Sequence, residues 1–97
     1  MNTLERDFIE KEKARERNGI ILMSKFDAID FVRQCEQNSI GILGIDGFYL
    51  IGDSIEPSSE NSIDFSSNNL SEPDVYNNSL NFISKQKEDL FFEIVCE

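Results

Sequence analysis

The side chains in this 97-residue chain that could do chemistry are mainly carboxylates. Residues 34–84 hold eight of them and no lysine or arginine; they are Glu36, Asp46, Asp53, Glu56, Glu60, Asp64, Glu72 and Asp74. Paired carboxylates act as general acid and base, or hold a divalent cation, when a structured cleft gives them separate environments. Six of the eight in this acidic segment (residues 34–84) lie in residues 52–74, which are rich in turn-forming residues, so the sequence favours a solvated surface over an active site.

Other residue types used in catalysis are scarce. The chain has no histidine, which removes the commonest general base and metal ligand. Cys35 and Cys96 are too few for a closed zinc site, and we expect two free thiols, with a single bridge as the alternative. The glycines at 41, 44 and 47 lack the dinucleotide-binding spacing. We therefore predict a protein that is not an enzyme, with no catalytic residue, metal or cofactor.

The charge of the chain is concentrated in the same acidic segment. Nineteen acidic and nine basic residues give a formal net charge of −10, and residues 34–84 contribute −8 of it. A charge gathered in one stretch creates a directional field. That field repels nucleic acids and anionic membranes, because binding phosphates needs lysine and arginine, and it attracts a basic partner. We predict a basic protein partner, with no direct contact to nucleic acid or membrane.

Length and composition indicate a single domain over residues 1–97. A chain of this size with 39% hydrophobic residues can bury a core of its own. No apolar run approaches the roughly 20 residues that span a bilayer, and the charged N-terminus lacks the apolar stretch of a signal peptide. We therefore expect a cytoplasmic protein.

Two helices are predicted in the first part of the chain. Residues 1–18 form a charged N-terminal helix, prone to fraying, that ends at Asn18-Gly19. Residues 20–23 are either a short strand or a buried approach to the next helix. That second helix begins at Ser24, which caps it together with Asp27. Its apolar side chains fall on one face and are Ala28, Ile29, Phe31, Val32 and Cys35.

The remaining elements are strands and one more helix. Asp46-Gly47 between two apolar runs predicts a hairpin of residues 42–45 and 48–51. Residues 52–74 are predicted to be a long acidic loop rich in serine and asparagine, pinned by a short strand at 62–66. A helix follows from Ser71, and residues 90–96 alternate as a final strand. This order predicts an α+β fold: a small antiparallel sheet, made of the hairpin and the C-terminal strand, with helices packed on one face.

Three short stretches resemble small bacterial immunity proteins. They are residues 42–48, residues 61–66, and the Phe91-Phe92 strand that follows a short helix. Immunity proteins accompany polymorphic toxins, including those of contact-dependent growth inhibition, and the resemblance extends over residues 19–97. It implies a cytoplasmic inhibitor that binds the C-terminal domain of a cognate secreted toxin and covers its active site. We expect a 1:1 complex, and the family provides no catalytic residues.

Charge and resemblance together predict an inhibitor of a basic toxin, with a nuclease as the expected type. An acidic surface can occupy a cationic groove as a substrate decoy, and complementary fields speed association. The predicted partner-binding residues are Asp46, Tyr49, Asp53, Glu56, Glu60, Asp64, Phe65, Glu72, Asp74 and Tyr76. The aromatic residues are the expected anchors, unless they lie in the core. Alternatives are a nucleic-acid mimic of the antirestriction type, a non-catalytic adaptor subunit, and a merely solvated acidic surface.

Overall fold

The computed structural model describes residues 1–65 and 72–97 and has an α+β fold. In chain order its elements are α1 (Thr3–Glu10), β1 (Arg15–Arg17), β2 (Ile20–Ser24), α2 (Lys25–Gln37), β3 (Ile42–Ile51), β4 (Ser54–Asp64), α3 (Glu72–Ser84) and β5 (Phe91–Cys96). The strands form one antiparallel sheet in the order β1-β2-β5-β3-β4. The predicted fold class is confirmed, and the sheet is larger than predicted because β1 and β2 join it.

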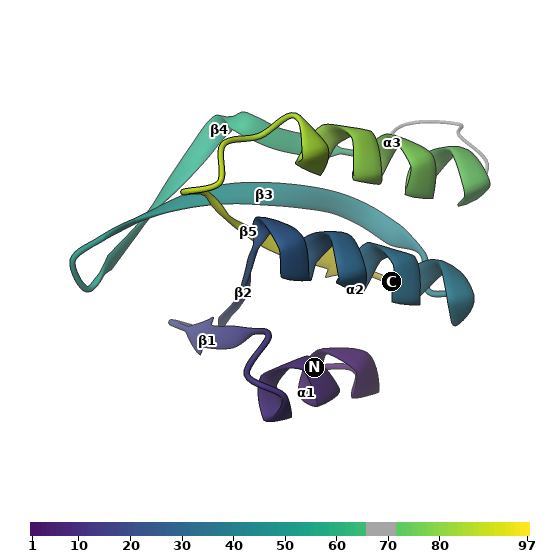
Figure 1. The fold of residues 1–97 in the computed structure, drawn as a ribbon, viewed down its shortest axis with the longest axis horizontal. Coiled ribbons are helices and arrows are strands. Elements are labelled where there is room, and N and C mark those ends of the chain that lie inside the picture. The colour runs from purple at the N-terminus through teal and green to yellow at the C-terminus, as the bar shows by residue number, and fades with distance from the viewer. Residues whose placement is uncertain (66–71) are drawn as a thin grey trace.

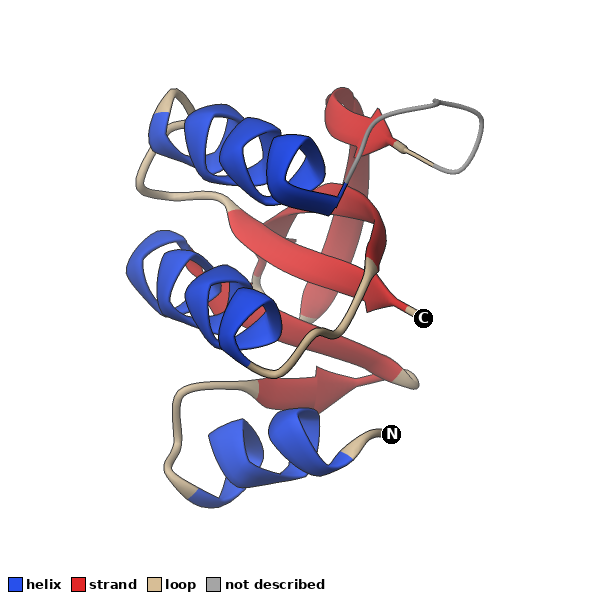
Figure 2. Ribbon diagram, turned by 90° about the vertical axis from the view of Figure 1, so that its right-hand side faces the viewer, coloured by secondary structure: helices blue, strands red, loops and turns tan. Residues whose placement is uncertain are grey.

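The helices lie on one face of this sheet, as predicted (Figure 1, Figure 2). α2 is the middle helix; it contacts α1 and α3 and packs against β2 and β5. The main core lies between this helical layer and the sheet, and Phe8, Phe31 and Phe92 are among its fully buried side chains. None of the described helices is long and apolar enough to cross a membrane.

α2 forms where it is predicted because its start and its apolar face are encoded locally. The Ser24 hydroxyl accepts a hydrogen bond from the Asp27 backbone N–H (3.4 Å) and donates one to the Asp27 carboxylate (3.1 Å). This contact caps the first turn of the helix. The predicted apolar face is confirmed by its buried residues, which are Ala28, Phe31, Val32 and Cys35. The rings of Phe31 and Phe8 meet edge to face at 5.0 Å, which joins α2 to α1.

The N-terminal helix is shorter than predicted. It ends at Glu10, and residues 15–17 form β1 instead of further helical turns. Asn18 and Gly19 have positive φ angles of 53° and 81° and turn the chain from β1 into β2. This dipeptide is therefore a hairpin turn and not a helix end. Like charges four residues apart within residues 11–17 disfavour a longer helix, which is the physical reason for the difference.

The predicted turn at Asp46-Gly47 is wrong. β3 runs straight through both residues, and the chain turns into β4 at Gly52-Asp53, where Gly52 has a φ of 61°. Gly47 is required for close packing instead: a Cβ on it would lie 2.4 Å from the Asn61 carbonyl oxygen of β4. An Asp-Gly pair thus serves here to let two strands approach, because this glycine leaves room for the backbone of the neighbouring strand.

The predicted loop over residues 52–74 is wrong for most of the part that the structure describes. Residues 54–64 form β4, which pairs with β3 as the edge strand of the sheet. A bulge interrupts this pairing after Ser58. The Gly47 N–H donates to Ser62 Oγ (3.2 Å), and Ser62 Oγ donates to the Ser58 carbonyl oxygen (2.9 Å). Polar side chains that are typical of a loop therefore satisfy backbone groups inside a bulged strand.

The last two elements agree with the sequence analysis. α3 begins at Glu72, close to the predicted start, while the predicted cap Ser71 and residues 66–70 lie outside the described residues. β5 spans Phe91–Cys96, and its burial alternates as predicted along the first four residues. In both elements the apolar residues recur at the spacing of the structure that forms, so the sequence itself already favours a helix in the one and a strand in the other.

Removing a ring from the buried face of α2 should destabilise the protein strongly. Phe31→Ala is expected to cost about 3–5 kcal/mol, because it deletes a large side chain that is fully buried. Phe26→Ala is the matched control, since Phe26 lies on the same helix and is 66% exposed. Urea unfolding monitored by circular dichroism measures both variants. Equal destabilisation by the two changes would contradict the burial of Phe31.

The two thiols should differ in reactivity. The hydrogen bond between the Cys35 thiol and Cys96 raises the pKa of Cys35, which burial raises further, and lowers the pKa of Cys96 in spite of its burial. Cys35 is fully buried, whereas Cys96 is half-buried. Iodoacetamide should therefore label Cys96 first in the native protein, and Cys35 only after unfolding. Peptide mapping by mass spectrometry gives the order, and faster labelling of Cys35 would contradict this prediction.

Candidate partner-binding surface

Five of the predicted binding carboxylates lie on the hairpin of β3 and β4. They are Asp46 in β3, Asp53 in the turn, and Glu56, Glu60 and Asp64 in β4. All of them are exposed except Asp46, which is half-buried. The hairpin falls within the acidic segment, so it carries no lysine or arginine of its own. The fold therefore gathers these charges on one structural unit.

The end of this hairpin extends beyond the neighbouring strand (Figure 1). β5 pairs with β3 only as far as Phe48, whereas β4 pairs with β3 up to the turn. Residues 49–56, which we term the hairpin arm, are thus paired only with each other. Ile51 is next to the turn and is 63% exposed, with the exposed Asp53 two residues away. Sequence analysis missed Ile51 as a contact residue because it placed the turn at Asp46-Gly47.

Phe65 and Tyr76 are not the exposed anchors that we predicted. Their exposed fractions are only 5% and 3%, and both belong to the main core. The Tyr76 hydroxyl donates a hydrogen bond to the Ile40 carbonyl oxygen at 2.5 Å. The sequence contained a signal for this position, because Tyr76, Ser79 and Ile83 recur at helical spacing and all three are buried.

The other three predicted residues have separate positions. Tyr49 is half-buried and packs against the main core at the base of the hairpin arm. Asp74 is exposed on the first turn of α3, at the end of the molecule away from the arm's turn (Figure 1). Glu72 begins α3, and its side chain lies outside the described part of the structure. The structure therefore does not bring Asp74 together with the arm.

The face of the sheet opposite the helices carries a second group of apolar side chains. Phe92 and Ile94 of β5 belong to the main core, so the alternate residues Phe91, Glu93 and Val95 point to the opposite face. All three are half-buried. Figure 2 shows this face on the side of the sheet away from the helices. We call it the open face.

Two further side chains are buried on the open face. Phe48 of β3 lies opposite Phe91, and Leu22 of β2 alternates with two residues of the main core. Phe48 is 6% exposed and Leu22 is 1% exposed, yet neither belongs to the main core. The open face therefore has an apolar centre, where the outward face of an antiparallel sheet is commonly polar.

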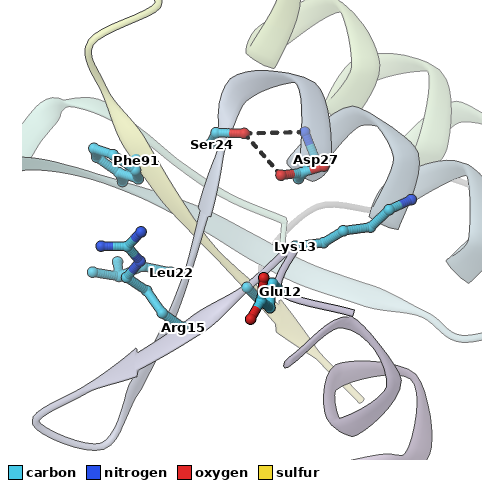
Figure 3. Close-up of a pocket in the computed structure, with 8 residues that line it drawn as sticks. Glu12, Lys13, Arg15, Leu22, Ser24, Asp27 and Phe91 are labelled. Carbon is cyan, nitrogen blue, oxygen red and sulfur yellow. Dashed lines mark hydrogen bonds between the residues drawn. The ribbon is translucent and has the colours of Figure 1, made fainter. Parts of the chain in front are cut away.

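A small hollow of about 70 Å³ lies beside this apolar centre (Figure 3). Leu22, Phe91 and Arg15 line it, together with the Ser24–Asp27 cap of α2. The hydrogen bonds of Ser24 and Asp27 are those of the helix cap, so these side chains have a structural role. Among the described residues, no group of three or more cysteine, aspartate or glutamate side chains is placed to hold a metal ion.

Two carboxylates stand opposite each other on the open face. Asp46 of β3 pairs with Glu93 of β5 in the antiparallel register. Burial raises the pKa of Glu93, and the negative charges of Asp46 and Glu5 raise it further. Like charges directly opposite in a sheet are destabilising. Sequence analysis missed Glu93 because it lies outside the acidic segment and joins the other carboxylates only through strand pairing.

Comparison with known proteins does not assign this chain to a family. The chain matches no protein-family model, and no curated protein sequence is significantly similar to it. The resemblance to immunity proteins therefore stays a prediction. Any function has to be argued from the charge, shape and exposed residues of the surface.

Neutralising Glu93 should change how stability depends on pH. Because its pKa is raised, Glu93 binds its proton more tightly in the folded state than in the unfolded chain. Its contribution to the free energy of unfolding is therefore fully present below pH 4.5 and is lost as the pH rises. Glu93→Gln should remove this loss, and its stability relative to wild type should increase above pH 4.5. Thermal unfolding across pH 4–8 tests this, with the exposed Glu56→Gln as the control. The same pH dependence in both variants would contradict it.

Proposed function

We propose that this protein is a non-catalytic cytoplasmic inhibitor that binds a basic partner protein, as an immunity protein binds its toxin. The observation that carries the proposal is the hairpin of β3 and β4. It holds Asp46, Asp53, Glu56, Glu60 and Asp64 within a segment that has no lysine or arginine. Its arm extends beyond β5, so Asp53 and Glu56 are presented on a projecting element.

A projecting acidic hairpin suits a cationic groove. Enzymes that cleave nucleic acids line their grooves with lysine and arginine to neutralise phosphates. A hairpin that enters such a groove replaces the phosphates with carboxylates and excludes the substrate. Complementary fields raise association rates by roughly 10- to 1,000-fold, which helps an inhibitor that must act before its target does damage. The expected partner is therefore a secreted nuclease toxin domain, bound 1:1.

Affinity needs apolar anchors in addition to charge, and the structure changes which residues these are. Phe65 and Tyr76 are buried in the core and are replaced by Ile51, which is 63% exposed next to the turn of the arm. Tyr49 remains a candidate at the base of the arm, because it is half-buried. Desolvated anchors near the centre of an interface dominate the binding energy, while the surrounding charges set the association rate.

The same acidic hairpin also fits a nucleic-acid mimic that blocks a DNA-binding enzyme. The two functions share a cationic target and differ in its identity. Affinity purification of the protein from its native host, followed by mass spectrometry, identifies the target. Recovery of a secreted toxin domain supports the immunity function, and recovery of a restriction enzyme or repressor supports the mimic. Recovery of a larger stable assembly without a basic subunit would favour an adaptor and contradict the proposal.

Reversing the charge of the hairpin should slow association with the purified basic partner. We expect a variant with four carboxylates changed to Lys to associate roughly 10- to 1,000-fold more slowly at low salt. The four residues are Asp53, Glu56, Glu60 and Asp64. The effect should shrink as salt rises, because screening acts beyond about 8 Å at physiological ionic strength. Stopped-flow fluorescence measures the rate, and the dissociation rate should change much less.

The matched control for this variant reverses four exposed carboxylates elsewhere. Glu10, Glu12, Glu16 and Glu36 are exposed on the β1 side of the sheet and on the helices, and changing them to Lys alters the net charge by the same amount. This control should slow association much less, because its charges lie away from the hairpin. Equal slowing by the two variants would show that net charge alone matters. An unchanged rate for the hairpin variant would remove the physical support for the inhibitor.

A further inference from the structure

The open face combines an apolar centre with separated charges. Phe48 pairs with Phe91 at its centre. Asp46 and Glu93 form a cross-strand pair two residues along each strand from these phenylalanines, while Arg15 pairs with Leu22 at the β1 edge. The face therefore has an acidic part over β3 and β5 and a basic edge. No helix within residues 1–65 and 72–97 covers it (Figure 2).

The acidic part of this face borders a hollow that a side chain could enter. The hollow has a volume of about 350 Å³, and its lining residues are Leu43, Gly44, Asp46, Ile63, Asp64 and Val95. Leu43 is 39% exposed, and Val95 is half-buried. The lining thus offers aliphatic surface beside two carboxylates. This is the composition that accommodates a long side chain with an apolar stem and a cationic end.

The repulsion between Asp46 and Glu93 identifies the sign of what binds there. In the free protein these like charges face each other across two paired strands, and Glu93 is also partly removed from water. An arginine or lysine of a partner would turn this unfavourable contact into two favourable ones. A second copy of this chain docked with its acidic part on this one would instead bring further carboxylates to the same place. An anionic membrane would be repelled.

We propose that the open face is a docking site for an extended segment of a partner protein in which every second residue is arginine, lysine or aliphatic, so that both kinds of side chain point to the same face. Its cationic side chains lie at Asp46 and Glu93, and its aliphatic side chains cover Val95 and Phe91. This inference rests on the proposed function, since it names the part of the basic partner that contacts this face. It adds a contact surface distinct from the hairpin arm.

Two capped heptapeptides test this docking site on the intact protein. One has arginine and valine in turn at every second position, with serine between them, and the other has glycine in place of valine, so that both carry the same charge. Titration followed by two-dimensional NMR of backbone amides locates the binding. The valine peptide should shift residues 43–48 and 91–95, and it should bind on the order of tenfold more tightly than the glycine peptide, because only it adds apolar contact.

Paired variants separate the open face from the arm. Asp46→Asn with Glu93→Gln should weaken binding of the valine peptide on the order of tenfold. Asp53→Asn with Glu56→Gln makes the same chemical change on the arm and should weaken it twofold or less. Thermal unfolding confirms that both variants fold, and the first pair should raise the midpoint because it removes the repulsion between Asp46 and Glu93.

The outcomes distinguish this inference from the function on which it rests. Equal binding of the two peptides, or shifts confined to residues 49–56, would overturn the open face as a docking site while leaving an acidic hairpin that binds cations. Absence of binding by either peptide would overturn the docking site and also count against a basic partner. Shifts on the open face that the Asp46→Asn/Glu93→Gln variant abolishes would support it.

Discussion

The double pairing of β3 is the constraint on which the rest of this structure depends. β3 lies between β5 and β4 and pairs with both, so its backbone must be approached closely on each side. Gly47 makes the approach of β4 feasible, because any side chain at this position would collide with the Asn61 carbonyl oxygen. The same pairing directs Ile45 into the main core and Asp46 to the open face. One strand thereby organises the core and presents the charges.

Backbone pairing, serine hydrogen bonds and apolar packing hold the acidic hairpin in place. Ser62 and Ser58 close the bulge of β4 through hydrogen bonds, and Ile63 packs against the main core. The ion pair of Lys13 with Asp30 (2.8 Å) joins the loop after α1 to α2, and that of Lys11 with Asp7 (3.0 Å) lies at the end of α1. Exposed pairs of this kind contribute little to stability. Packing and backbone pairing thus hold the hairpin in place, and Asp53, Glu56 and Glu60 are exposed on it.

Local patterns predicted those elements whose ends and faces are encoded within a few residues. The cap at Ser24 and the apolar spacing of α2 were sufficient for that helix, and alternation was sufficient for β5. β4 was missed because its serines satisfy backbone groups only once β3 lies beside them. The turns were misplaced for a related reason: Asn18-Gly19 and Asp46-Gly47 are both turn-forming dipeptides, and only tertiary pairing shows which one turns.

The candidate surface shows the same division between local and tertiary information. Composition alone located the carboxylates of the hairpin, because a segment without lysine or arginine cannot neutralise itself. It could not locate Glu93, which meets Asp46 only across paired strands. Nor could it tell exposed aromatic residues from buried ones, so Tyr76 was placed on the surface and Ile51 was overlooked. A free protein that keeps two carboxylates opposite each other gives up stability at that position. A cationic partner would reverse this cost, so an unfavourable contact of the free protein would become a favourable one in the complex.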